Sequence, residues 1–237
     1  MKNRLIDIIK LLISIIVLLC IGDISHIILS IFNINVDDFG IKVTALYQCI
    51  LSFILFIVLL ALYYDKFKLD LIKFKKELNK NISSIIKIFI IFMITKYIIT
   101  IFTSFIIILM GYDTSSAISI NQKMLETYVK SAPILMLISG SILAPFYEEG
   151  IFRLGFKKVI NNKWIFIVFS GTIFGALHVF PLDKGVTLAL GIIQSISYIT
   201  MGMFLSYIYY KTDNIYSSIG VHFLNNFLSV LVVINMF

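Results

Sequence analysis

Residues 43 to 64 read VTALYQCILSFILFIVLLALYY and contain no charged side chain. A helix needs about 20 residues to cross the roughly 30 Å hydrocarbon core of a bilayer, so this run is long enough for one crossing. The whole chain has the same character, since 59% of its 237 residues are hydrophobic and only 14% are charged. Soluble domains are about 45–50% apolar and about 25% charged. The sequence therefore predicts an all-α protein embedded in a membrane.

Further apolar runs on both sides of this segment predict a polytopic transmembrane helical bundle with about seven, and between six and eight, spanning helices. The expected spans lie near residues 5–32, 43–64, 82–110, 132–157, 164–179, 187–210 and 215–236. The remaining long polar segment, residues 111–130, is expected to be a loop. Cys20 and Cys49 stand alone within apolar runs, so neither a disulfide framework nor a cysteine metal site is predicted.

The net charge of +7 comes from short basic clusters between the apolar runs. No nucleic-acid recognition motif accompanies them, so we predict a lipid bilayer and no nucleic acid as partner. The clusters fall in alternate loops, and the positive-inside rule then places the N-terminus in the cytoplasm and the C-terminus outside the cell membrane. Within 65–80, lysines alternate with apolar residues, which indicates a short helix lying on an anionic membrane surface.

The fourth apolar run contains three charged residues in the segment PFYEEGIFR, residues 145–153. Each charge at the bilayer centre costs roughly 2.5–3.5 kcal/mol on insertion scales, so these side chains must face a paired or wet interior. Glu149 and Arg153 are four residues apart and can pair on one helix face. Glu148 has no such local partner, which makes its carboxylate a candidate general base.

Two histidines lie in later apolar runs, each four residues from another side chain of interest. His178 follows Phe174, and His222 precedes Asn226, so each pair shares one helix face. An unpaired imidazole or amide is costly in a membrane interior. These residues are therefore candidates for the same polar site.

Helix geometry indicates which of these groups can meet. If the fourth and fifth spans form an antiparallel hairpin turning at residues 161–162, Glu148 and His178 differ in depth by only about 4.5 Å. His222 lies about one helical turn away, and it joins them only if that hairpin projects into the cytoplasm. Glu148 and His178 are therefore the better supported pair. If the hairpin projects that far, the three helices converge on one cavity that faces the cytoplasm.

Taken in order, the three motifs are Glu148-Glu149-x-x-x-Arg153, Phe174-x-x-x-His178 and His222-x-x-x-Asn226. This pattern resembles the CPBP family of intramembrane proteases, also called the CAAX protease and bacteriocin-processing (Abi) family, over residues 132–230. The resemblance implies a catalytic core over residues 132–237. Residues 1–131 would then be N-terminal membrane helices with a basic cytoplasmic amphipathic loop.

The same resemblance implies an intramembrane endopeptidase that cleaves a membrane-associated or lipidated peptide near the cytoplasmic face. A water activated by glutamate and histidine would attack the peptide carbonyl, while histidine and asparagine would bind the oxyanion or orient the site. The implied catalytic residues are Glu148, His178, His222 and Asn226. The residues implied to support them are Glu149, Arg153 and Phe174.

The cofactor and the substrate stay open at this stage. Glu148, His178 and His222 can supply three ligands to a divalent metal such as zinc, but the sequence has no HExxH motif. We favour a metal-free mechanism. Prenylated C-terminal peptides, pheromone precursors and bacteriocin precursors are all candidate substrates, and the sequence does not choose among them.

Two other classes of protein share some of these features. A bacteriocin-immunity or scaffold membrane protein would use the bundle to bind a partner without catalysis. An ion-coupled or proton-coupled transporter also places ionisable residues in the membrane, but no internal repeat is present. Lys96 is unexplained, and it either pairs with a buried carboxylate or snorkels beside Tyr97. Asp183 either orients His178 or caps a loop, and it is not counted among the site residues.

Overall fold

The computed structural model describes residues 2–182 and 184–235, and the elements in this part of the chain are helical. Six helices are long and apolar enough to cross a membrane, which confirms the polytopic helical bundle. The fifth expected span is a shorter apolar helix of 15 residues. The long helices outside the motif-bearing span are α1 (Lys2–Ile31), α2 (Ile41–Leu62), α4 (Leu78–Leu109), α10 (Leu188–Thr212) and α11 (Ile215–Asn235), and the short one is α9 (Lys163–Leu177).

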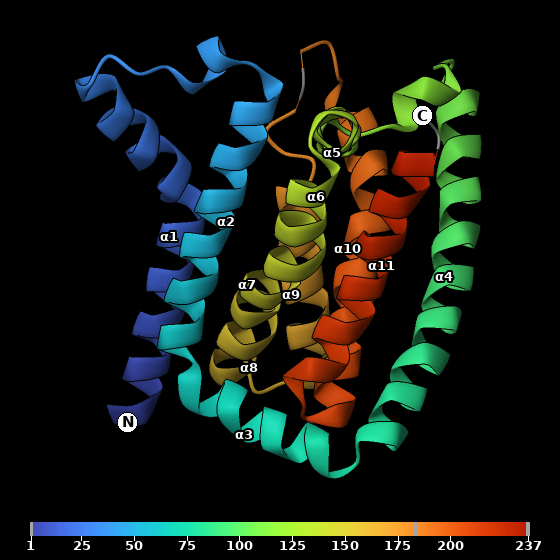
Figure 1. The fold of residues 1–237 in the computed structure, drawn as a ribbon. Helices are drawn as coiled ribbons and strands as arrows, with labels where there is room; N and C mark the ends of the chain where they lie inside the picture. Colours follow the sequence, from blue (N-terminus) through green and yellow to red (C-terminus); the bar gives the residue numbers. More distant parts are fainter. Residues whose placement is uncertain (1, 183, 236–237) are drawn as a thin grey trace.

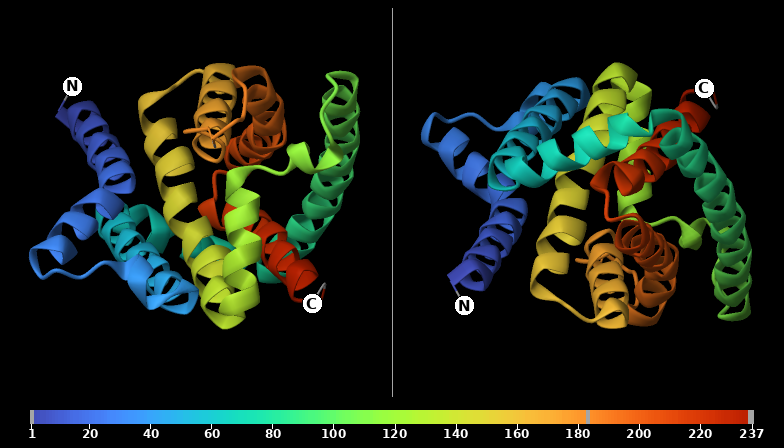
Figure 2. Two further views of the ribbon diagram at one scale, coloured as in Figure 1. Left: turned by 90° about the horizontal axis from the view of Figure 1, so that it is seen from above. Right: turned by 90° about the horizontal axis from the view of Figure 1, so that it is seen from below.

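The helices in the centre of the bundle include α9, α10 and α11. They are flanked by α1 and α2 on one side and by α4 on the other (Figure 1). Helix α3 (Tyr64–Lys76) runs across one end of the bundle and joins α2 to α4, as the view from below in Figure 2 shows. The N-terminal end of α1 lies at this same end, whereas α11 finishes at the opposite end. A single helix therefore lies across one end of the bundle.

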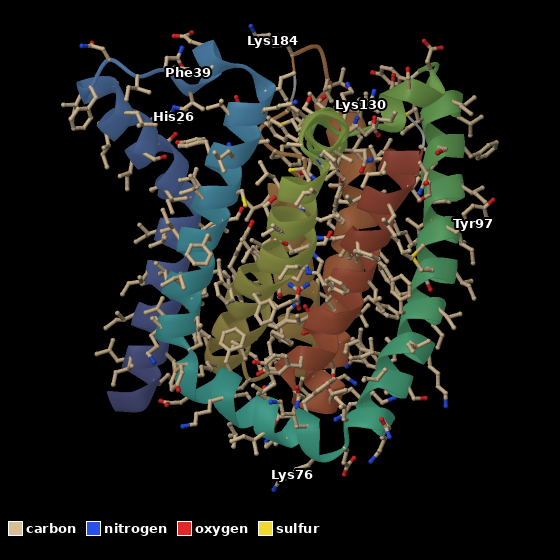
Figure 3. The ribbon with its side chains drawn as sticks, in the orientation of Figure 1. His26, Phe39, Lys76, Tyr97, Lys130 and Lys184 are labelled. Atoms are coloured by element: carbon tan, nitrogen blue, oxygen red, sulfur yellow. The ribbon has the colours of Figure 1, made fainter. Side chains whose placement is uncertain are left out.

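Helix α3 confirms the short helix predicted within residues 65–80, and Lys76 marks its position at the end of the bundle in Figure 3. Its Asp70 side chain is fully buried, and it accepts hydrogen bonds from Lys66 Nζ at 2.9 Å and from the Ile215 backbone N–H at 3.0 Å. A carboxylate at a helix start satisfies a backbone donor that has no partner within the helix. Helix α3 thereby fixes the first turn of α11, which carries two of the candidate site residues.

Residues 111–130 differ from the loop that the sequence predicts. They contain the 3₁₀ turn η2 (Thr114–Ala117) and most of helix α5 (Ile120–Ser131), which lies at the end of the bundle opposite α3 (Figure 1). Ser119 caps α5 by accepting a hydrogen bond from the Gln122 backbone N–H. Val129 of this helix is buried, so a few apolar contacts order a segment whose composition is polar.

The motif-bearing span, residues 133–159, is a continuous helix with two π-helical segments. Pro145 lacks a backbone N–H, so a regular α-helix would leave a carbonyl one turn earlier without its donor. A π segment rearranges these hydrogen bonds to an i→i+5 pattern, and such segments are frequent at functional sites. In chain order the span consists of α6 (Pro133–Met136), η3 (Leu137–Leu143), α7 (Ala144–Glu149), η4 (Gly150–Gly155) and α8 (Phe156–Val159).

Helix α9 packs against α10 through two glycines. A Cβ added at Gly175 would lie 2.3 Å from the backbone N of Ile199, and one added at Gly171 would lie 2.5 Å from the backbone N of Met203. Small residues allow such close helix packing within membranes. The position of His178, directly after α9, therefore depends on the absence of a side chain at Gly175.

We expect Gly175→Ala to destabilise the bundle by about 1–3 kcal/mol, because overpacking a tight contact forces backbone shifts. The measurement is thermal unfolding of the purified protein in detergent. Gly22→Ala in α1 is the matched control, because an added Cβ there meets nothing within 4 Å. Equal melting temperatures for the two variants would contradict the packing argument.

Candidate active site

Glu149 and Arg153 form a buried ion pair within the motif-bearing span. Both side chains are fully buried, and Nε of Arg153 lies 3.0 Å from Oε2 of Glu149, which confirms the predicted i,i+4 pair. Neither Nη atom of Arg153 has a hydrogen-bond acceptor among the described residues. The guanidinium instead lies over the ring of Phe174, 4.9 Å from its centroid. Cation–π attraction thus supplements the ion pair.

His222 lies between the two adjacent glutamates. Its Nδ1 is 3.0 Å from Oε1 of Glu149, and its Nε2 is 3.7 Å from Oε2 of Glu148. An ionised carboxylate only accepts hydrogen bonds, so Nδ1 of His222 carries the proton in this contact. His222 is therefore the histidine in contact with both glutamates, although the depth estimate from the sequence supported Glu148 and His178 more strongly as a pair.

His178 caps the end of α9 and is oriented by two contacts. Its Nδ1–H donates to the carbonyl oxygen of Phe174 at 2.8 Å, which leaves Nε2 of the neutral ring as an acceptor. The ring also stacks on Tyr198 with 4.9 Å between centroids, and the Tyr198 hydroxyl lies 2.9 Å from Oγ of Ser119. Sequence reasoning missed Tyr198, which is one aromatic residue among many in the apolar runs.

Phe174 is the aromatic residue that joins the separate parts of this cluster. Its fully buried ring lies 4.5 Å from the ring of His178 and 5.8 Å from the ring of His222, measured between centroids. It also lies beneath the Arg153 guanidinium. The structure therefore brings together this predicted supporting residue, both histidines and the buried ion pair.

Asn226 extends the polar cluster along α11. Its Nδ2 donates to the carbonyl oxygen of Gly140 in η3 at 2.8 Å, and its Oδ1 accepts from Nδ2 of Asn225 at 3.0 Å. An asparagine amide has two N–H groups, so one remains after the bond to Gly140. Nζ of Lys96 donates to Oδ1 of Asn225 at 2.8 Å. The partner of Lys96 is therefore an amide and not the expected carboxylate.

The four candidate catalytic residues line one cavity of about 590 Å³. Its volume is in the range of ligand-binding pockets, about 300–1,000 Å³. The lining also includes Gln122 and Tyr128 of α5, but no residue of α3 among those that the structure describes. The cavity thus extends toward the α5 end, whereas the sequence led us to expect an opening at the lysine-rich end. The side of the membrane that each end of the bundle faces stays a prediction. The catalytic candidates are Glu148, His178, His222 and Asn226.

The donor arrangement does not fit the three-ligand metal site that the sequence left open. Among the described residues, no group of three or more His, Cys, Asp or Glu side chains is placed to hold a metal ion. Phe174 and Glu149 hold the Nδ1 atoms of His178 and His222, which leaves Nε2 of each ring for other contacts. No step proposed below passes through a metal. Asp183 lies outside the described residues.

The fold and the site together define a class: a polytopic helical membrane protein with a glutamate–histidine–asparagine cluster that lines an internal cavity. Residues 130–228 match the family model described as type II CAAX prenyl endopeptidase Rce1-like. This part of the chain is therefore similar to the CAAX protease family, which confirms the resemblance seen in the sequence. No curated protein and no solved structure matches the chain.

Proposed function

We propose that the chain is an intramembrane endopeptidase that hydrolyses a peptide bond in a membrane-associated or lipidated peptide. The observation that carries the proposal is the convergence of a carboxylate, two imidazoles and an amide on one cavity within a CAAX protease domain. A bundle that needed only to pack would not require these groups to share a cavity. Access from the α5 end is part of the proposal.

In the proposed reaction, Glu148 is the general base. It accepts a proton from water as the water oxygen attacks the carbonyl carbon of the substrate. When the carbon–nitrogen bond breaks, the same proton is delivered to the departing amine. Nε2 of His178 is the acceptor that orients the water, because its Nδ1–H is held by Phe174. General base catalysis of this kind contributes about 10²–10⁴-fold to a rate.

The proposed oxyanion site lies on α11. The free N–H of Asn226 can donate to the developing negative oxygen, and its amide is held by Gly140 and Asn225. Preorganised donors of this type cost no reorganisation during the reaction. Glu149 orients the ring of His222 through Nδ1–H, and in the doubly protonated ring the Nε2–H would be the second donor. The Glu149–Arg153 pair would act indirectly, by holding His222.

The assay that tests this function uses the purified protein in lipid nanodiscs. The probes are a peptide with a farnesylated cysteine near its C-terminus, the same peptide without the lipid, and a bacteriocin leader peptide, with products identified by mass spectrometry. We expect a specific internal cleavage, fastest for the lipidated peptide. Because the donors do not group as three metal ligands, we expect cleavage to persist with a chelator. Absence of cleavage of all three peptides would refute the proposal, and chelator-sensitive cleavage restored by zinc would refute its metal-free form.

A further inference from the structure

Lys96 is a charged residue of α4 that the proposed reaction does not use. Its side chain lines the cavity, and Lys96 and Glu148 are the only Lys, Arg, Asp or Glu residues in the described lining. An ammonium group has three N–H donors, and Asn225 accepts one of them. No ion pair joins Lys96 to a carboxylate in the part of the chain that the structure describes. Two donors and an uncompensated charge are therefore left on the cavity wall.

The cavity-facing side of α4 is polar next to this lysine. Thr100 is one helical turn further along, and Ser104 is one turn beyond that, so their hydroxyls line the cavity on the same face. Tyr97 has the opposite orientation, since it is 70% exposed and points away from the bundle in Figure 3. Snorkelling beside Tyr97 therefore does not explain Lys96. Helix α4 presents a cation and hydroxyl groups to the cavity and apolar side chains to its surroundings.

Asn225 connects Lys96 to the proposed oxyanion donor. Its Oδ1 accepts from Lys96 at 2.8 Å, and its Nδ2 donates to Oδ1 of Asn226 at 3.0 Å. Lys96 is thus two hydrogen bonds away from the Asn226 amide. A group bound at Lys96 would lie in the same cavity as the scissile bond of a bound peptide.

We propose that Lys96, together with Thr100, forms a subsite for a carboxylate of the peptide substrate. A buried charge in a membrane protein is stabilised by an opposite charge, and a carboxylate can accept charge-assisted hydrogen bonds from both the ammonium and a hydroxyl. The identity of the ligand as a peptide rests on the proposed function. The carboxylate can come from the C-terminus of the peptide or from an acidic side chain, and the experiment distinguishes the two sources.

The test is a binding measurement that requires no turnover. Three peptides are bound to the wild-type protein in detergent micelles. They are acetyl-Val-Leu-Leu as the free acid, the same peptide as the C-terminal amide, and acetyl-Val-Leu-Asp as the C-terminal amide, which carries its carboxylate on the side chain. We expect the free acid to bind about tenfold or more tightly than the amide, as a charge-assisted hydrogen bond implies. Lys96→Met should remove this difference, and Lys96→Arg should retain part of it. Tighter binding of the free acid alone would identify the C-terminus as the source of the carboxylate, and equally tight binding of the aspartyl amide would show that a side chain serves as well. If neither binds more tightly than the neutral amide, the proposal fails.

Lys87→Met is the matched control, because Lys87 is an exposed lysine of the same helix. It should keep the wild-type preference for the free acid. Equal affinity of Lys96→Met and wild type for the amide would show that the variant is folded. A preference for the acid that persists in Lys96→Met would overturn the subsite. A protein that cleaves peptides but does not distinguish acid from amide would refute the subsite alone, whereas selective binding without any cleavage would refute the proposed function alone.

Discussion

Replacing Glu148 with glutamine is expected to reduce peptide cleavage by about 10²–10⁴-fold, which is the contribution of a general base. Glutamine has nearly the same shape as glutamate but cannot accept the proton from the attacking water. The Glu148 side chain is 14% exposed and does not take part in the Glu149–Arg153 pair, so its loss should leave folding intact. The measurement is the cleavage rate of the lipidated peptide, compared with the melting temperature and the amount of protein in the membrane.

Glu126→Gln in α5 is a suitable control, because it removes a carboxylate outside the cavity lining and makes the same chemical change. We expect this control to cleave at the wild-type rate. Wild-type cleavage by Glu148→Gln would disprove the general-base assignment. If bacteriocin protection survives in Glu148→Gln, the non-enzymatic immunity reading would be the better one.

Replacing Arg153 with methionine is expected to destabilise the protein by about 3–5 kcal/mol, because it leaves the buried Glu149 carboxylate without its cation. The melting temperature and the accumulation of the variant in the membrane would report this loss. The double variant Glu149→Gln/Arg153→Met removes both charges, and the methionine can still pack on Phe174. Most of the lost stability should return, because two neutral groups replace a buried ion pair.

Cleavage should not return with stability in this double variant. His222 donates through Nδ1 to Glu149, and glutamine is a weaker acceptor than the carboxylate, so the orientation and charge of the ring would change. The double variant thus separates two effects of the Glu149–Arg153 ion pair, which are the stability of the protein and the positioning of His222. A double variant that is as unstable as Arg153→Met would show that the stability does not come from charge compensation.

The spans and the ion pair of the motif could be predicted because the information is local. Apolar runs reveal the long helices, and a spacing of four residues places Glu149 beside Arg153. The short helix within residues 65–80 was predictable for the same reason, since its lysines and apolar residues alternate in sequence. Helix α5 was missed because its apolar side chains are few and its polar ones dominate the segment.

Contacts between distant segments could not be predicted with the same certainty. Arithmetic from turns placed Glu148 level with His178, but it assumed regular α-helices, whereas the span contains π segments on both sides of Glu148. The same arithmetic gives the depth of a residue but not the rotation of α11 about its axis, and it is this rotation that brings His222 between the glutamates. The hydrogen bond from Lys96 to Asn225 joins residues 129 positions apart, and no local pattern indicates it. The basic clusters lie at one end of the bundle, as expected for clusters in alternate loops. The side of the membrane that this end faces stays a prediction.

The two π segments have a consequence for changes in chain length within the span. A π turn corresponds to one residue more than an α turn, and one residue rotates an α-helix by about 100°. Deleting one of residues 141–143 of η3 would leave the helix long enough to cross the membrane, yet it would turn Gly140 and Glu148 to different faces relative to one another. The hydrogen bond from Asn226 to Gly140 and the contact between His222 and Glu148 would then no longer form together. The spacing between these two positions is therefore under a constraint of angular register, in addition to any constraint on the identity of the residues.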